Sequence, residues 1–149
     1  MSPNRKAFLD MIAFSEGTST VKGSDNGYNV LVGGKLFTGY SDHPRKLIQL
    51  NDNLKSSAAG RYQLLARYYD DYKSLLGLKD FSPDSQDAIA IQQIKECRAL
   101  PDVDSGKFSD AVDKCKHIWA SLPGAGYGQR ENKLSYLQSV YENSGGQVA

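Results

Sequence analysis

The chain has few of the residues that build metal sites or disulfide frameworks. It contains only two cysteines and two histidines, and neither cysteine belongs to a C-x-x-C pair. Because these four residues show no zinc-type spacing, we expect no metal and no cofactor. The even count permits a disulfide, but a chain of this size does not need one, so Cys97 and Cys115 are expected to be structural thiols.

Long apolar runs and an excess of one charge are also missing. No run of roughly 18 apolar residues occurs, so no membrane span is expected. Asp10 interrupts the apolar segment after Arg5 and Lys6, and no small-residue cleavage site follows, which argues against a signal peptide. The net charge is +1 with basic and acidic residues dispersed, which argues against nucleic-acid binding and stable membrane insertion. We therefore expect a protein that is kept in the cytoplasm.

What remains is an ordinary globular composition, with 40% hydrophobic and 23% charged residues. At 149 residues, the chain is expected to form one domain over residues 1–149. Caps and helical periodicity predict five helices, over residues 2–16, 61–76, 82–98, 108–119 and 134–141.

Strands are predicted only in the first third of the chain. Two β-rich runs, residues 28–32 and 35–38, meet across Gly33 and Gly34, which is the pattern of a tight hairpin. Residues 45–55 are expected to form a loop with at most a short strand. Since these strands are segregated from the helices that follow, the sequence predicts an α+β fold.

The first predicted helix ends in the residue with the strongest chemical indication, Glu16. Phe8, Ile12 and Glu16 follow helical spacing, so the carboxylate ends an apolar face. Gly17 is typical of the position just past a helix C-terminus. The negative end of the helix dipole and the apolar neighbours both disfavour the ionised carboxylate. Glu16 is therefore expected to hold its proton unusually well, as an acid that cleaves a glycosidic bond must. A merely solvated glutamate is the alternative.

Several motifs occur in one order along nearly the whole chain. They are the Ser15-Glu16-Gly17 helix end, the hairpin, and residues 40–47 (YSDHPRKL), 60–63 (GRYQ), 76–83 (LGLKDFSP) and 122–129 (LPGAGYGQ). In this order they resemble the lambda-type bacteriophage endolysins, which are lysozyme-like lytic transglycosylases of the bacterial cell wall. The resemblance implies a mostly helical, lysozyme-like α+β fold with a β-hairpin lobe and a cleft between the lobes. Two lips, residues 46–55 and 123–136, would border this cleft.

The resemblance also implies an activity and its residues. Glu16 maps onto the family's single essential glutamate, and Arg61, Tyr62, Gln63 and Tyr127 are mapped onto its saccharide subsites. The substrate would be the β-1,4 bond between N-acetylmuramic acid and N-acetylglucosamine, and the product a 1,6-anhydromuramoyl end. For Tyr62, packing in the core remains an alternative.

Two other functions remain open. A hydrolytic muramidase on the same scaffold needs a second carboxylate, for which Asp25 and Asp42 flank the hairpin. A non-catalytic glycan-binding or virion structural module would keep the fold without the activity. For the enzyme, we expect a monomer whose partners are peptidoglycan strands. A separate membrane-permeabilising protein would release it from the host cytoplasm, so that it acts on the wall in the periplasm.

Overall fold

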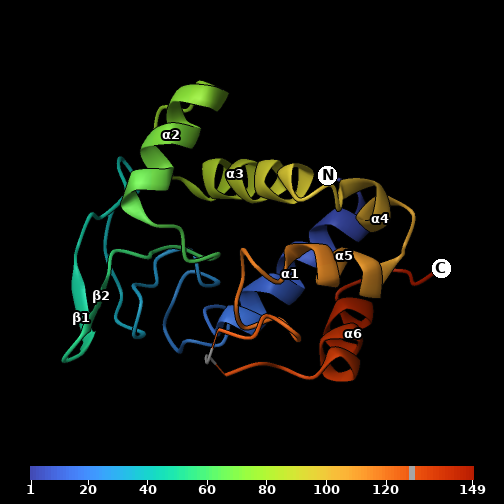
Figure 1. Ribbon diagram of the computed structural model, residues 1–149. Coiled ribbons are helices and arrows are strands. Elements are labelled where there is room, and N and C mark those ends of the chain that lie inside the picture. The colour runs from blue at the N-terminus through green and yellow to red at the C-terminus, as the bar shows by residue number, and fades with distance from the viewer. Residues whose placement is uncertain (128–129) are drawn as a thin grey trace. The chain divides into compact units, whose positions relative to one another are not determined.

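The computed structural model describes residues 1–127 and 130–149. These residues form a mostly helical structure with a small antiparallel sheet, in agreement with the predicted α+β class (Figure 1). In chain order the elements are α1 (Pro3–Glu16), β1 (Ile48–Asn51), β2 (Leu54–Ser56), α2 (Ala66–Leu76), α3 (Pro83–Glu96), α4 (Leu100–Asp104), α5 (Phe108–Cys115) and α6 (Leu134–Asn143).

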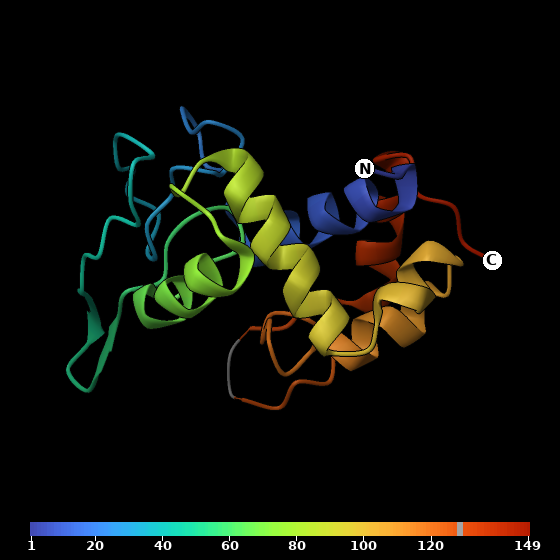
Figure 2. The ribbon, with the colours of Figure 1, turned by 90° about the horizontal axis from the view of Figure 1, so that it is seen from above.

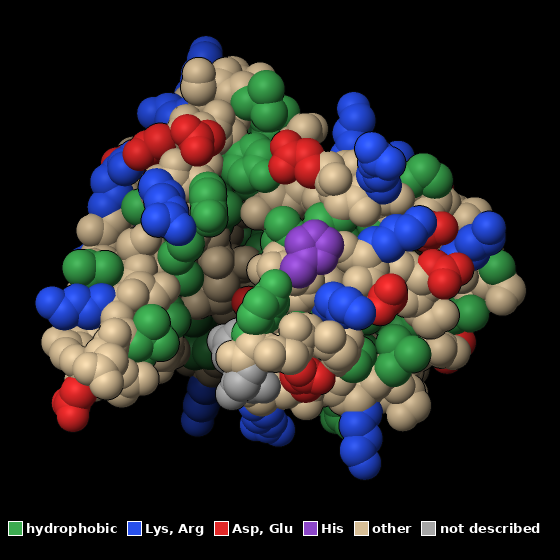
Figure 3. Space-filling view, in the orientation of Figure 1, with side chains coloured by type: hydrophobic (Ala, Val, Ile, Leu, Met, Phe, Trp, Pro, Cys, Tyr) green, Lys and Arg blue, Asp and Glu red, His purple; other side chains and the backbone are tan. Residues whose placement is uncertain are grey.

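The chain forms two compact units. Unit 1 comprises residues 1–16 and 90–149, and unit 2 comprises residues 17–89. The single domain expected over residues 1–149 stays a prediction. Within the described residues, no helix combines the length and the hydropathy that crossing a membrane requires. On the face seen in Figure 3, basic and acidic side chains are interspersed.

Unit 1 is built around α1, which packs against α6 and α4 (Figures 1 and 2). Phe8 and Ile12 of the predicted apolar face are buried, and so are Ala7, Leu9, Met11 and Ala13, so burial extends beyond one face of the helix. The ring of Phe8 meets Phe108 of α5 edge-on at 6.1 Å. α1 is therefore enclosed along most of its length, and it ends at Glu16, where Gly17 takes a φ of 80°.

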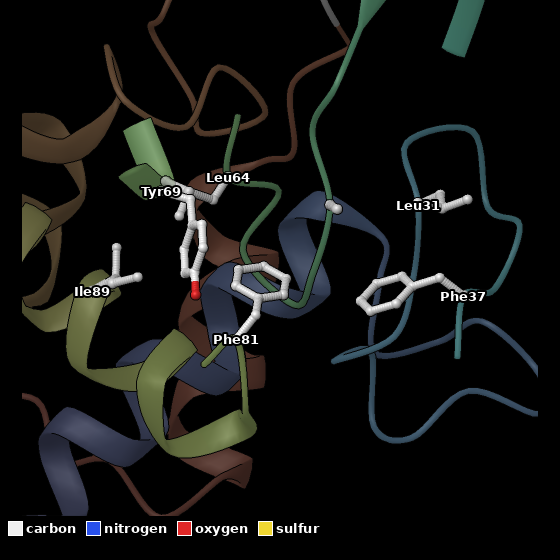
Figure 4. Close-up of a cluster of buried hydrophobic side chains, with 7 residues drawn as sticks. Leu31, Phe37, Leu64, Tyr69, Phe81 and Ile89 are labelled. Atoms are coloured by element: carbon white, nitrogen blue, oxygen red, sulfur yellow. The ribbon is translucent and has the colours of Figure 1, made fainter. Parts of the chain in front are cut away.

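The core of unit 2 is a cluster of apolar and aromatic side chains: Leu31, Phe37, Ala59, Leu64, Tyr69, Phe81 and Ile89 (Figure 4). His43 packs against this cluster, with its ring centroid 4.9 Å from that of Phe81. The backbone N–H of Arg45 donates to His43 Nδ1 at 2.9 Å, so Nε2 carries the proton and donates to the Leu64 carbonyl at 2.8 Å. Burial lowers the pKa of His43, which makes it a neutral core residue.

The predicted hairpin is present only as a tight turn. Leu31 N–H donates to the Lys35 carbonyl at 2.7 Å, and Gly33 and Gly34 have φ values of 89° and 100°. A second bond, from Phe37 N–H to the Asn29 carbonyl at 2.9 Å, accompanies a single isolated bridge between Val30 and Leu36, and Val32 N–H donates to the Ala58 carbonyl at 3.0 Å. The regular sheet, β1 with β2, lies in the segment for which only a loop with a short strand was expected, so the main strand positions, residues 28–32 and 35–38, were predicted wrongly.

Two helix predictions also need correction. The long helix begins at Ala66 and not at Arg61, because Gly60 and Gln63 have positive φ values of 85° and 55° and form a turn. Six helices are found among the described residues in place of five, because Pro101 lies in the first turn of the additional helix α4 and does not only terminate α3.

Candidate active site

Glu16 is the last residue of α1, and Gly17 follows it with a φ of 80°, as predicted. No basic residue lies in the last turn of this helix. The carboxyl group is partly buried, and this desolvation raises its pKa above the usual 4.5. The expected direction of the shift is thus confirmed, and burial is its main cause.

The carboxyl group of Glu16 is held by a chain of hydrogen bonds within unit 1. The Ser121 hydroxyl donates to Glu16 Oε2. Ser121 Oγ lies 2.8 Å from the hydroxyl of Ser15, and both serines are buried. Asn132 Nδ2 donates to Ser15 Oγ at 3.1 Å and to the Ser15 carbonyl at 3.2 Å. Ser121 thus contacts the carboxyl group directly, and Ser15 and Asn132 support Ser121 from behind.

The backbone around this network is anchored on both sides. Ser121 lies in the turns after α5, beside the buried Trp119 and Leu122. Asn132 precedes α6, and its backbone N–H donates to the Ser121 carbonyl at 2.9 Å. Sequence reasoning missed both residues, because Ser121 is 105 positions away from Glu16 and no local spacing connects them.

Tyr127, which was assigned to a saccharide subsite, is 63% exposed. The loop before it is organised by Glu131, whose two carboxylate oxygens accept the N–H groups of Gly124 and Gly126 at 2.9 and 3.0 Å. These donors lower the pKa of Glu131. The Tyr127 side chain is therefore accessible, and its subsite role stays a prediction. Gly128 and Gln129 of the same motif and predicted lip lie outside the described residues.

Tyr62 belongs to the interior of unit 2. Its side chain is 5% exposed, and its hydroxyl donates to Asp87 Oδ1 at 2.6 Å. Tyr28 donates to the same carboxylate at 2.9 Å, and burial raises the pKa of Tyr62. The structure favours the packing alternative for Tyr62. Asp87 was not singled out from the sequence, because its position on a predicted helix gave no indication of the two tyrosines it binds.

The neighbours of Tyr62 in the turn are also engaged within unit 2. Arg61 is 4% exposed, and its Nε donates to the Asn26 carbonyl at 2.9 Å. The Gln63 side chain donates to the carbonyls of Val30 and Gly60, at 3.2 and 2.9 Å. These contacts shape the turn, and direct contact of Arg61, Tyr62 and Gln63 with a saccharide stays a prediction.

The two carboxylates considered as second catalytic groups both lie in unit 2 and both have partners. Asp42 accepts hydrogen bonds from Nε and Nη2 of Arg45 at 2.8 and 3.2 Å, and this guanidinium lowers the pKa of Asp42. Asp25 accepts the hydroxyl of Tyr40 at 2.7 Å. Among the residues that the structure describes, no three His, Cys, Asp or Glu side chains gather in a way that would hold a metal ion.

The family model described as Endolysin matches residues 6–148. The chain belongs to the endolysin family. The endolysin of Escherichia phage lambda is 61% identical, with 97% of this chain and 92% of the relative covered. The endolysin of Escherichia phage P2 is 47% identical, with coverage of 96% and 93%.

Solved structures confirm the lysozyme-like fold of this endolysin. Bacteriophage lambda lysozyme complexed with a chitohexasaccharide matches with a TM-score of 0.97 and 59% identity. The comparison covers all of this chain and 98% of the lysozyme. The family predicted from the motif order is thereby confirmed, whereas the roles of individual residues rest on the geometry described above.

Proposed function

We propose that this endolysin cleaves the β-1,4 bond between N-acetylmuramic acid and N-acetylglucosamine of peptidoglycan by intramolecular transglycosylation. The observation that carries the proposal is the partly buried Glu16, whose raised pKa favours a carboxyl group that still has a proton to donate. The chitohexasaccharide bound to the related lambda lysozyme supports a glycan strand as the ligand.

In the first step Glu16 acts as a general acid. Its proton passes to the bridging oxygen while the bond between that oxygen and muramoyl C1 breaks. The oxygen leaves as the free hydroxyl of the neighbouring sugar, and positive charge develops at C1. Burial of Glu16 favours this transfer, because the carboxyl group loses water that would otherwise stabilise its ionised form.

In the second step Glu16 acts as a base. The muramoyl C6 hydroxyl attacks C1 of the same sugar, a C6–O–C1 bond forms, and the hydroxyl proton returns to Glu16. The enzyme is regenerated and no water is consumed. The attacking oxygen is already part of the reacting sugar. The enzyme therefore does not need to bind and orient a water molecule as the nucleophile.

The surroundings of the other carboxylates support a mechanism with one catalytic acid. Hydrolysis on this scaffold normally uses a second carboxylate, either to activate water or to attack the sugar. Asp42 is already neutralised by Arg45, and Asp25 already accepts the Tyr40 hydroxyl. Neither is a free base, which favours transglycosylation over the muramidase alternative.

The products distinguish the two reactions. Purified peptidoglycan digested in ¹⁸O-labelled water is expected to give muropeptides with anhydro ends that are one water lighter than reducing ends and carry no label. A hydrolytic muramidase treated in parallel provides the control for label incorporation. Labelled reducing ends from this endolysin would overturn the transglycosylase mechanism in favour of hydrolysis, and binding to peptidoglycan without cleavage would favour the non-catalytic module.

The same proposal includes a cellular route. The endolysin would accumulate in the cytoplasm of an infected host and reach the periplasm after a separate membrane-permeabilising protein acts, and cleavage of the wall would then lyse the host. The phage origin of both relatives supports this role.

A further inference from the structure

We propose that Ser121 is a positioning residue that assigns the transferable proton of Glu16 to Oε1. Ser15 and Asn132 would hold Ser121 in the required orientation. The inference rests on the proposed function of Glu16 as the catalytic acid. It concerns which carboxyl oxygen delivers the proton and which contact opposes the effect of burial on the pKa of Glu16.

The direction of the hydrogen bonds follows from the number of protons available. Asn132 Nδ2 can only donate, so Ser15 Oγ accepts its hydrogen bond. Among the hydrogen bonds of the described residues, the acceptor for the proton of the buried Ser15 hydroxyl is Ser121 Oγ, at 2.8 Å. Because Ser121 accepts from Ser15, its own single proton is directed to Glu16 Oε2. The donors therefore run in one direction, from Asn132 through Ser15 and Ser121 to the carboxyl group.

This one-way chain distinguishes the two oxygens of Glu16. Oε2 already accepts the hydrogen bond from Ser121, so a proton placed on Oε2 would meet the hydrogen that Ser121 directs at this oxygen. The acidic proton is accordingly carried by Oε1. When that proton leaves, the negative charge that appears is stabilised through Oε2, because hydrogen bonds donated in series strengthen one another.

The network is built into the fold and is not a set of surface hydroxyls. Ser15 and Ser121 are 8% and 9% exposed. Asn132 holds both of them, through its side chain on Ser15 and its backbone N–H on Ser121. All four residues belong to unit 1, so the arrangement is complete within one unit.

Two opposing effects then set the acidity of Glu16. Burial raises its pKa, and the Ser121 hydrogen bond lowers it, and these are the two causes of the shift. Ser121 stabilises the ionised carboxylate, so its removal leaves burial unopposed. The pKa of Glu16 must then rise further, and the protonated form must persist to higher pH.

The test compares Ser121→Ala with Ser121→Thr in the full chain. The Glu16 carboxyl is titrated by ¹³C NMR, and the pH dependence of peptidoglycan cleavage is measured in parallel. Ser121→Ala is expected to raise the pKa of Glu16 by about one unit and to move the high-pH limb of the rate profile upward by the same amount. We expect kcat to fall by about 10-fold with little change in KM, because the acid is less well oriented.

Two variants serve as controls: one keeps a hydroxyl at position 121, and the other removes a hydroxyl far from Glu16. Ser121→Thr keeps a hydroxyl and is expected to restore both the titration and the rate. Ser139→Ala removes an exposed hydroxyl that donates to the Ser135 carbonyl in α6, and it should match the native protein. Ser15→Ala is expected to shift the pKa in the same direction as Ser121→Ala but by less, since Ser121 keeps its own proton.

A Glu16 titration that does not move in Ser121→Ala, or that Ser121→Thr fails to restore, would overturn the proposal. If Ser121→Ala does not fold, Ser15→Ala and Asn132→Ala decide the question by the same titration. The NMR result does not depend on activity. A failure of this inference can therefore be distinguished from a failure of the proposed function, which would appear as an active Glu16→Gln variant.

Discussion

Replacing Glu16 by Gln is expected to reduce cleavage of peptidoglycan by about 10²–10⁴-fold, the range typical of a lost general acid. The amide has the shape of the carboxyl group and can still accept the Ser121 hydrogen bond through its oxygen, but it has no proton of suitable acidity. Turbidity loss of a peptidoglycan suspension measures the effect. Near-normal cleavage by the variant would remove Glu16 from the catalytic role.

The same substitution is expected to stabilise the fold at neutral pH. The pKa of Glu16 is raised in the folded protein, so its contribution to stability is fully present below its unfolded value and is lost as pH rises through the folded value. Glu16→Gln avoids this loss. Its unfolding free energy should exceed that of the native protein at pH 7, and the difference should shrink toward pH 4. Glu142→Gln, an exposed change in α6, is the matched control and should alter neither activity nor stability.

Replacing Gly60 by Ala is expected to destabilise the protein by about 3–5 kcal/mol. Gly60 has a φ of 85°, which disfavours any residue with a Cβ atom. The added Cβ would also lie 2.5 Å from Gln86 Oε1 and 2.8 Å from Phe81 Cζ. Gln86 is buried and holds the backbone of the turn by accepting the Arg61 N–H at 2.8 Å, so moving it breaks that contact.

Gly23→Ala separates backbone strain from steric overlap. Gly23 has nearly the same φ, 80°, but no atom lies within 4 Å of the position its Cβ would take. Only the conformational penalty of about 1–2 kcal/mol is expected there. Urea denaturation followed by circular dichroism measures both variants. Equal losses for Gly60→Ala and Gly23→Ala would contradict the close packing of Gln86 and Phe81 around the turn.

The end of α1 could be predicted because its determinants are local. An apolar periodicity, a terminal glycine and a carboxylate at the last position all lie within one short segment, and the structure places Glu16 where they indicated. The direction of its pKa shift also followed, because neighbouring apolar residues on a helix face are buried together.

The strands were harder to predict, because pairing depends on partners far along the chain. Residues 28–38 have the composition of a hairpin, yet their pairing is limited to the isolated bridge at Val30 and Leu36. The paired strands β1 and β2 have only four and three residues, so the apolar–polar alternation of Ile48 to Asn51 is too short to mark a strand.

The candidate site likewise contains one residue that local sequence indicated and others that only tertiary packing brings to it. Glu16 was visible in the sequence, whereas Ser121 and Asn132 reach it only through the packing of distant segments of unit 1. Arg61 and Tyr62 were assigned to a saccharide subsite from their motif, but the motif does not specify whether the side chains face a ligand or the interior. The contact of Tyr62 with Asp87 became visible only in three dimensions.

The central claim is that Glu16 is an acid kept protonated by burial, and its own titration in the native protein tests this most directly. We expect ¹³C NMR of the Glu16 carboxyl in the intact, folded chain to give a pKa above the ordinary 4.5, since desolvation outweighs the hydrogen bond from Ser121. A pKa at or below 4.5 would mean that the carboxyl is solvated or fully stabilised as an anion, and it would contradict the account.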